Sequence, residues 1–400
     1  MVTMQDDELQ VLGRGTASKR NRKKFVWGAI IIAFAFMTLW IWRFITSVEN
    51  QDGRAEIGST LNDDLRRLAT GLLNRELTEL NGLQGQVIVM EVETGAIKAM
   101  VGLERKYDGS YEPCENFAYQ QEPGSIVKTA VMLALLETGE VKLTDEVDVD
   151  NGIWALDELY TIRDHNWSRG GYGVINMERV LEVSSNIGIS KMVQKVFKGR
   201  EQEFFNSLAR MSFGEPSSVE GIEGLKPMRY SSPKDSTWAY RQLLWSAIGY
   251  DRFMTSIQTL AFYNAIANDG RMVKPSLRKG EAEVINEQIA SKENIAEIQK
   301  ALYHVVSEGL AKPAGTPLVE VAGKTGTAQV RSLYGESGTE ESEYNVSFCG
   351  YFPAFAPKYS IIISLNKMGL PTSGGQMAGS VFHDIVEWMV HHGWIDEDNK

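Results

Sequence analysis

The chain has 400 residues, of which 43% are hydrophobic and 23% are charged, the composition of a globular protein with a substantial core. Its formal net charge of -11 at pH 7 gives no reason to expect a nucleic-acid partner, because nucleic-acid-binding surfaces are basic. The five histidines and two cysteines lack the spacing of a metal site, so we expect neither a metal nor a cofactor. Cys114 and Cys349 are far apart in sequence, and we expect two free thiols.

The N-terminal region predicts a membrane anchor. Residues 1–24 end in a cluster of basic side chains, and residues 25–45 are apolar and almost uncharged, which is long enough to span a bilayer. A cleaved signal peptide is the alternative, but the one stretch that resembles a cleavage site, Ala33-Phe34-Ala35, lies inside the apolar run. The positive flank predicts that residues 1–24 are cytoplasmic and that the chain after about residue 46 is exported.

Residues 46–82 are polar and carry leucines at a helical spacing, and they predict a stalk or a first helix that links the anchor to the folded domain. Residues 85–101 predict a β-hairpin that turns at Thr94-Gly95. The next strong signal is the run from Ile126 to Leu136, which is apolar on nearly all sides. A helix of that kind is buried in the middle of a domain.

The rest of the chain predicts more helices and then a second group of strands. Helices are expected at 177–182, 187–197, 201–213, 255–268, 293–309 and 377–391. Between them, residues 217–241 predict a long irregular loop. Strands are expected at 317–330, 346–352 and 359–365, with residues 331–345 as an exposed connection. This order predicts an α+β domain over residues 83–400, with an antiparallel sheet formed from both ends of the chain.

A serine and a lysine at the start of the central helix form the first candidate catalytic pair. Pro123-Gly124 is a turn that precedes Ser125, and Lys128 follows three residues later, so the hydroxyl and the amine can meet on one helical face. A lysine whose pKa is lowered by burial can take the proton of a serine and so make it a nucleophile. A capping serine and a solvated lysine are the ordinary alternative for such a pattern.

Two further stretches strengthen the catalytic interpretation. Ser184-Ser185-Asn186 lies between two predicted helices, and Lys324-Thr325-Gly326 lies in a predicted strand. Together with Ser125-x-x-Lys128, these make up, in order, the motif set of class A β-lactamases and penicillin-binding proteins.

The chain resembles the serine D,D-transpeptidases of the class B penicillin-binding protein group, to which the cell-division transpeptidase belongs. The resemblance covers roughly residues 83–392 and rests on more than the three motifs. It includes Thr94–Met100, Glu122–Ser125, Gly249–Gly270, Ala322–Gln329, Ser347–Pro353 and Gly374–Phe382. It implies the penicillin-binding and β-lactamase-like transpeptidase fold, in which an antiparallel sheet is flanked by helices and an all-α lobe. It also implies that a single transmembrane helix in a bacterial cytoplasmic membrane precedes this domain.

The resemblance also implies a role for each motif residue. Ser125 would attack the D-alanyl-D-alanine end of a peptidoglycan stem peptide, and β-lactams would acylate it. Lys128 would accept the hydroxyl proton, and Ser184, between Lys128 and Lys324, would pass it to the leaving group. The remaining residues would bind the substrate. Asn186 would hold its backbone amide, and Thr325 and Thr327 would bind its terminal carboxylate. Gly326, which has no side chain, would let the substrate approach the strand closely. The N–H groups of Ser125 and Thr327 would form an oxyanion hole.

Other functions on the same motifs stay open from the sequence. A D,D-carboxypeptidase differs only in the acceptor, a β-lactamase or β-lactam sensor uses the same serine and lysine, and a non-catalytic cell-wall scaffold would need no intact site. Residues 46–82 are too few for the separate non-catalytic domain of class B proteins, so statements about partners, including a glycosyltransferase, are expectations from resemblance alone. In the segment before Ser184, we expect His165 and Trp167 to serve packing rather than chemistry.

Overall fold

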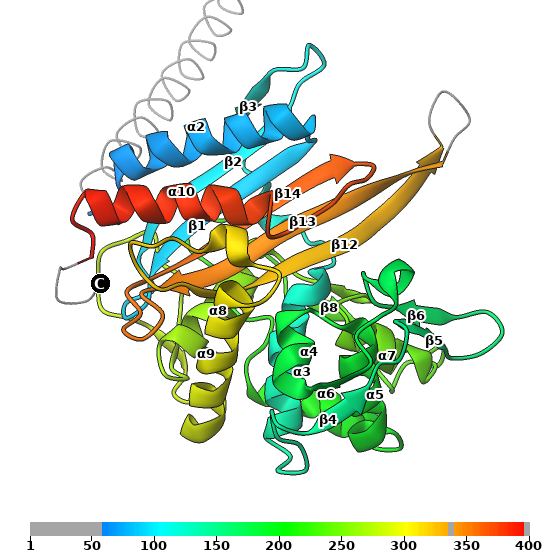
Figure 1. Cartoon of the computed structure of the whole chain (residues 1–400). Coiled ribbons are helices and arrows are strands. Elements are labelled where there is room, and N and C mark those ends of the chain that lie inside the picture. The colour runs from blue at the N-terminus through cyan, green and yellow to red at the C-terminus, as the bar shows by residue number, and fades with distance from the viewer. Residues whose placement is uncertain (1–57, 335–339, 396–400) are drawn as a thin grey trace, which may run out of the picture. The chain divides into compact units, whose positions relative to one another are not determined.

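The computed structural model describes residues 58–334 and 340–395, and from Ser59 onward these form one compact unit (Figure 1). Its centre is a six-stranded sheet with the strand order β12-β13-β14-β1-β2-β3, in which every neighbouring pair is antiparallel. The strands are β1 (Gln84–Glu91), β2 (Ile97–Arg105), β3 (Tyr111–Pro113), β12 (Ala322–Tyr334), β13 (Glu340–Phe352) and β14 (Tyr359–Met368). The pairing of β1 with β14 confirms that both ends of the domain build the sheet.

Helices cover both faces of the sheet. Ser360 of β14 donates a hydrogen bond to Asn264 of α8 (Ser256–Ala267), which places α8 on the face of the even-numbered β14 residues. On the opposite face lie α2 (Asp63–Leu80) and α10 (Ala378–His391), side by side in Figure 1. Because both faces are covered, β14 is buried along nearly its whole length, and its apolar residues include the uninterrupted run Ile361-Ile362-Ile363.

The first helix belongs to the domain rather than to a linker. Leu65, Leu73 and Leu77 of α2 are fully buried, and the Leu73 side chain lies so close to β1 that a Cβ on Gly85 would come 2.8 Å from it. Asn62 caps the helix by accepting from Leu65 N. The sequence predicts a stalk or a first helix here, and the structure shows a first helix. Residues 59–82 form part of the folded unit, because their leucines need the sheet to leave water.

The second lobe is mainly helical and carries the central helix. All nine residues of α3 (Lys128–Leu136) are buried, as their apolar sequence predicts. Three helices pack against it: α5 (Asn186–Phe197), α6 (Glu201–Arg210) and α9 (Lys292–Ser307). Two more lie on these in turn, with α4 (Met177–Glu182) against α5 and α9, and α7 (Arg241–Ala247) against α5. The unit also contains short two-stranded sheets: β4 (Glu146–Asp148) with β7 (Val174–Asn176), β5 (Ile153–Ala155) with β6 (Thr161–Arg163), β8 (Arg229–Tyr230) with β9 (Arg252–Phe253), and β10 (Met272–Val273) with β11 (Val284–Asn286).

Two segments differ from the sequence prediction. The exposed connection predicted at 331–345 is shorter, since β12 and β13 continue as a ladder as far as the pair Tyr334↔Glu340. The irregular loop predicted at 217–241 contains β8, and α7 begins at its end. Both strand extensions are rich in polar residues, so they lack the apolar pattern that marks a buried strand.

Both cysteines are free thiols, as the sequence predicts, with Cys349 buried in β13. Within the described residues, no helix has the length and apolar character needed to cross a membrane. The anchor predicted at residues 25–45 and the cytoplasmic tail predicted at 1–24 lie outside those residues.

The place of α2 in the core is testable by stability. Leu73→Ala should lower the free energy of unfolding by about 2–5 kcal/mol, because it leaves a cavity between α2 and β1. Leu159→Ala, at a leucine that is 85% exposed, is the control and should change it by less than about 0.5 kcal/mol. Equal, small effects in urea denaturation would show that α2 is not packed on the sheet.

Candidate active site

The turn that carries Ser125 is held from both sides by close backbone contacts. Ser125 lies in the 3₁₀ helix η2 (Gly124–Val127), which leads directly into α3. Gly124 has φ +59°, and a Cβ there would come within 2.5 Å of Thr327 O of β12. On the other side, a Cβ on Gly249 would lie 1.9 Å from Gly124 O. Glycine is required at both positions, and the turn is fixed against the third motif.

A buried tyrosine fixes the start of the central helix. The hydroxyl of Tyr263, on α8, donates to Ile126 O at 2.8 Å and lies 2.7 Å from the Thr129 hydroxyl. Tyr263 is fully buried, so these bonds are shielded from water. These bonds hold the backbone before Lys128 and the side chain after it, and they connect α8 to the start of α3.

The Lys128 amine is the centre of the site. Its Nζ lies 3.0 Å from Ser125 Oγ, 2.6 Å from Ser184 O and 2.6 Å from Asn186 Oδ1. Ser184 Oγ is also near, at 3.2 Å. A single nitrogen therefore joins the first two motifs, which are more than 50 residues apart in sequence.

This network matches a neutral amine. Ser184 O can only accept, and Asn186 presents its amide oxygen to Lys128 because its Nδ2 donates to Arg163 O at 2.9 Å. The two short bonds thus use two N–H groups, which is the full donor capacity of an uncharged amine. In a neutral amine the remaining lone pair would lie at the 3.0 Å contact with Ser125 Oγ, which is the contact through which a general base would take the hydroxyl proton.

Electrostatics makes the neutral amine accessible near pH 7. Burial lowers the pKa of Lys128 to about 7, while the Asp164 carboxylate acts in the opposite direction. The pKa of Lys324 is also lowered well below its ordinary value, first by burial and then by the charge of Lys128. Two fully buried amines in one site disfavour each other's charged form, so at most one is readily protonated.

A buried carboxylate holds the second motif. Asp164 accepts from Ser185 Oγ at 2.7 Å, from Asn186 N at 2.6 Å and from Ile187 N at 3.0 Å. The two backbone donors are free N–H groups at the start of α5, where a carboxylate is favoured. Ser184 itself has φ +53°, a conformation that non-glycine residues seldom adopt. Asp164 thus helps to keep Ser184 turned toward Lys128 in spite of that strain.

The third motif lies on β12, at the edge of the sheet. Lys324 is fully buried and donates to Thr325 O at 3.2 Å and to Thr325 Oγ1 at 3.4 Å. Thr327 donates to Gly326 O at 2.8 Å. A Cβ on Gly326 would lie 2.3 Å from Ser347 Oγ and 3.0 Å from Ile126, so a side chain there would displace the strand from η2.

A cleft of about 620 Å³ brings most of the predicted residues together. The predicted residues that line it are Ser125, Ser184, Asn186, Thr325 and Thr327. Lys128 and Lys324 are buried beneath its surface, and Gly326 is enclosed by its neighbours. Ser184 is predicted to lie between Lys128 and Lys324. Its hydrogen bonds connect it to Lys128 and not to Lys324, so only the Lys128 contact is observed.

The loop before the second motif contributes more to the cleft than the sequence analysis expected. Arg163, Asp164, His165 and Trp167 all line it. Trp167 is 47% exposed with Arg163 over its ring, and His165 lies 3.0 Å from Tyr172 OH. The sequence alone assigns no role to Asp164. Ser185 at the start of α5 is visible in the sequence as a capping serine, but only the fold brings the Asp164 carboxylate to it.

Comparison with known proteins agrees with this geometry. The model of the penicillin binding protein transpeptidase domain matches residues 85–387. The chain belongs to this family. Its relatives include stage V sporulation protein D of Bacillus subtilis, 27% identical over 66% of this chain and 41% of the relative. Another is the probable peptidoglycan D,D-transpeptidase PbpC of Pseudomonas aeruginosa, 26% identical over 86% of this chain and 60% of the relative.

The peptidoglycan D,D-transpeptidase MrdA of Acinetobacter baumannii is 26% identical over 80% of this chain and 53% of its own length. The chain thus spans about half the length of the curated relatives it matches. Among solved structures, a peptidoglycan glycosyltransferase from Burkholderia ambifaria superposes with a TM-score of 0.70 at 26% identity, over 84% of this chain and 98% of that one. The relatives are distant class B penicillin-binding proteins, and the α+β transpeptidase fold is confirmed.

The role of Asp164 is testable by substitution. Asp164→Ala removes three hydrogen bonds to a carboxylate, each worth about 1.5–3 kcal/mol, and should slow acylation by a fluorescent penicillin at least tenfold, even where circular dichroism shows a folded protein. Asp164→Asn, which keeps an oxygen for the two backbone donors, should retain more of the rate. Wild-type acylation in Asp164→Ala would contradict this role.

The protonation of Lys128 predicts a pH dependence. With a pKa of about 7, the amine is neutral above that value, so the acylation rate should rise about tenfold between pH 6 and pH 8. His165→Gln is the control, because His165 also lines the cleft. A rise that disappears in His165→Gln would assign the titration to the histidine instead.

Proposed function

We propose that this chain is a peptidoglycan D,D-transpeptidase that works through an acyl-enzyme on Ser125. The observation that carries the proposal is the buried Lys128 amine, bonded to Ser125 Oγ at 3.0 Å and held by Ser184 and Asn186. Such a pair supplies an activated nucleophile. The matching family and the relatives named as D,D-transpeptidases support acyl transfer on a D-alanyl-D-alanine peptide as the reaction.

In the first half-reaction, Ser125 Oγ attacks the carbonyl carbon of the penultimate D-alanine as Lys128 takes the hydroxyl proton. Ser184 passes a proton from the Lys128 side to the leaving nitrogen of the terminal D-alanine, and the peptide C–N bond breaks. In the second half-reaction, an amine from a neighbouring stem peptide attacks the ester, gives up its proton through the same groups, and releases Ser125. The net change is the exchange of D-alanine for the new amine.

Binding roles follow the walls of the cleft. Thr325 and Thr327 are proposed to bind the terminal carboxylate, with Lys324 adding positive potential beneath them whenever it is protonated. Asn186 is proposed to hold a backbone amide of the stem peptide, and the N–H groups of Ser125 and Thr327 to stabilise the oxyanion. β-Lactams would enter the same cleft and acylate Ser125.

Location and partners are part of the proposal. The basic segment 1–24 and the apolar segment 25–45 support a single-pass anchor in a bacterial cytoplasmic membrane, with the domain on its outer face. A glycosyltransferase of the wall-synthesis machinery is the expected partner, because crosslinking needs newly made glycan chains as substrate.

Covalent labelling tests the acyl-enzyme. The full chain should take up a fluorescent penicillin at Ser125, and the label should persist for hours in gels and by peptide mass spectrometry. Ser125→Ala should abolish labelling, because the nucleophile is removed, whereas Ser190→Ala, at a buried serine of α5 outside the cleft, is the matched control. Labelling of Ser125→Ala would contradict the assignment.

The same experiment separates the alternatives. A label that is lost within seconds would favour a β-lactamase, and no label would favour a scaffold. A persistent label leaves transpeptidase and carboxypeptidase, which are separated by supplying lipid II with an amine acceptor. Crosslinked product supports the proposal, while release of D-alanine without crosslinks supports the carboxypeptidase.

A further inference from the structure

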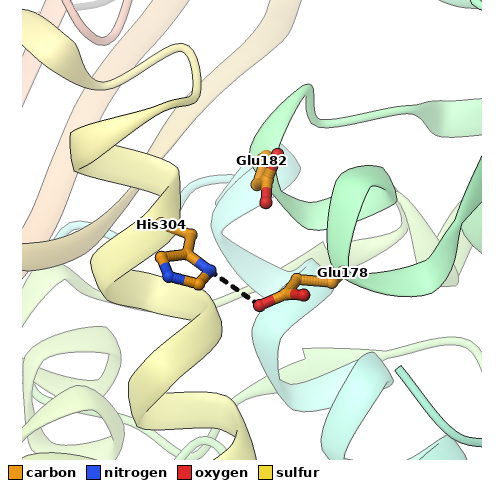
Figure 2. Close-up of side chains that lie close together, drawn as sticks. All are labelled: Glu178, Glu182 and His304. Carbon is orange, nitrogen blue, oxygen red and sulfur yellow. Dashed lines mark hydrogen bonds and ion pairs between the residues drawn. The ribbon is translucent and has the colours of Figure 1, made fainter. Parts of the chain in front are cut away.

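A second group of chemically active side chains lies where two helices of the helical lobe meet. Figure 2 shows Glu178 and Glu182 of α4 and His304 of α9 pointing toward one another. His304 Nδ1 lies 2.7 Å from Glu178 Oε1, although the two residues are 126 positions apart in sequence. One oxygen of each carboxylate and one imidazole nitrogen all lie within 4.8 Å of one another.

The group is far more buried than ordinary surface acids. The Glu182 side chain is 8% exposed and those of Glu178 and His304 are 23% exposed. Arg179 Nη1 lies 2.6 Å from Glu182 Oε2. Two carboxylates therefore lie close together in a poorly solvated place, where a divalent cation would offset their negative charge.

The donor types and spacing suit a transition metal. Imidazole nitrogen and carboxylate oxygen bind Zn²⁺ at about 2.0–2.2 Å, which in a tetrahedron separates ligand atoms by about 3.3 Å. To admit an ion, the 2.7 Å separation of His304 Nδ1 and Glu178 Oε1 would lengthen slightly. The Glu182 carboxylate would move toward both atoms. Arg179 could keep its bond to one oxygen of Glu182 while the other binds the ion, as a supporting partner of a ligating carboxylate.

We propose that Glu178, Glu182 and His304 bind a divalent transition-metal ion, with Zn²⁺ the preferred one, and that this ion clamps α4 to α9. The spacing of histidines and cysteines in the sequence predicts no metal site. This site has a single histidine, and its two carboxylates lie four residues apart on one helical face.

Both clamped helices lead into the cleft. Glu182 precedes Ser184 by two residues, and its backbone oxygen accepts from Leu310 N at 3.0 Å, just beyond the end of α9. Leu310 and Ser184 both line the cleft. A bound ion would therefore fix the wall that carries the second motif. This coupling rests on the proposed function, whereas binding of the ion does not.

Metal titration tests the site. The full chain, purified in a mild detergent without an affinity tag and freed of metal by a chelator, is titrated with Zn²⁺ by calorimetry and with Co²⁺ by visible absorption. We expect His304→Ala and Glu182→Gln each to weaken Zn²⁺ binding at least tenfold. His391→Ala, at an exposed histidine near the end of α10, and Glu297→Gln, at an exposed glutamate of α9, should bind like the wild type.

Thermal unfolding completes the test. Zn²⁺ should raise the melting temperature of the wild type, because it binds only the folded arrangement, and should not raise that of His304→Ala. His304 is partly exposed, so this variant should fold even if Glu182→Gln does not. No Zn²⁺ binding, or binding unchanged in His304→Ala, would overturn the site. Penicillin acylation that is equal with and without Zn²⁺ would overturn the coupling alone, and a protein that binds Zn²⁺ but no penicillin would contradict the proposed function and not the site.

Discussion

The site depends on keeping one lysine amine out of water. A charged Lys128 would be costly to bury, and the fold resolves this by holding its pKa near neutrality and by giving the amine two acceptors, Ser184 O and Asn186 Oδ1. With those two acceptors satisfied, the amine keeps its third contact, 3.0 Å, for Ser125 Oγ. The burial that lowers the pKa of Lys128 is thus what would let it act as the proposed base, and it exists only because the helical lobe closes over the amine.

Several parts of the fold serve this one arrangement. The edge strand β12 carries Lys324, Thr325 and Thr327, and its backbone at Thr327 packs closely against Gly124. α8 fixes the start of α3 through Tyr263, and Asp164 ties the second motif to the loop before it. These contacts come from residues far apart in the chain. The geometry of Ser125, Lys128 and Ser184 is therefore a property of the whole unit rather than of any one motif.

Sequence reasoning reached the elements whose signals are local. Thr255 forms the capping box with Gln258 that begins α8, α4 spans the predicted residues, and the apolar run 126–136 is buried as expected. It failed where the deciding contacts are distant. The leucines of α2 predict either a stalk or a first helix, and only the sheet on which they pack decides between the two. The polar extensions of β12 and β13 carry no strand pattern. Asp164 and the cluster at His304 acquire their roles only from partners brought close by folding.

The most direct test of the central claim is the protonation of Lys128 in the free protein. Lysine carrying ¹³C at Cε can be followed by NMR across a pH titration, with Lys128→Arg used to assign the resonance. The account predicts a lysine signal that titrates near pH 7 in the wild type and is missing from the variant. A Lys128 signal that titrates near its ordinary value of about 10.4 would show a charged ammonium at neutral pH, and Lys128 could then not serve as the base.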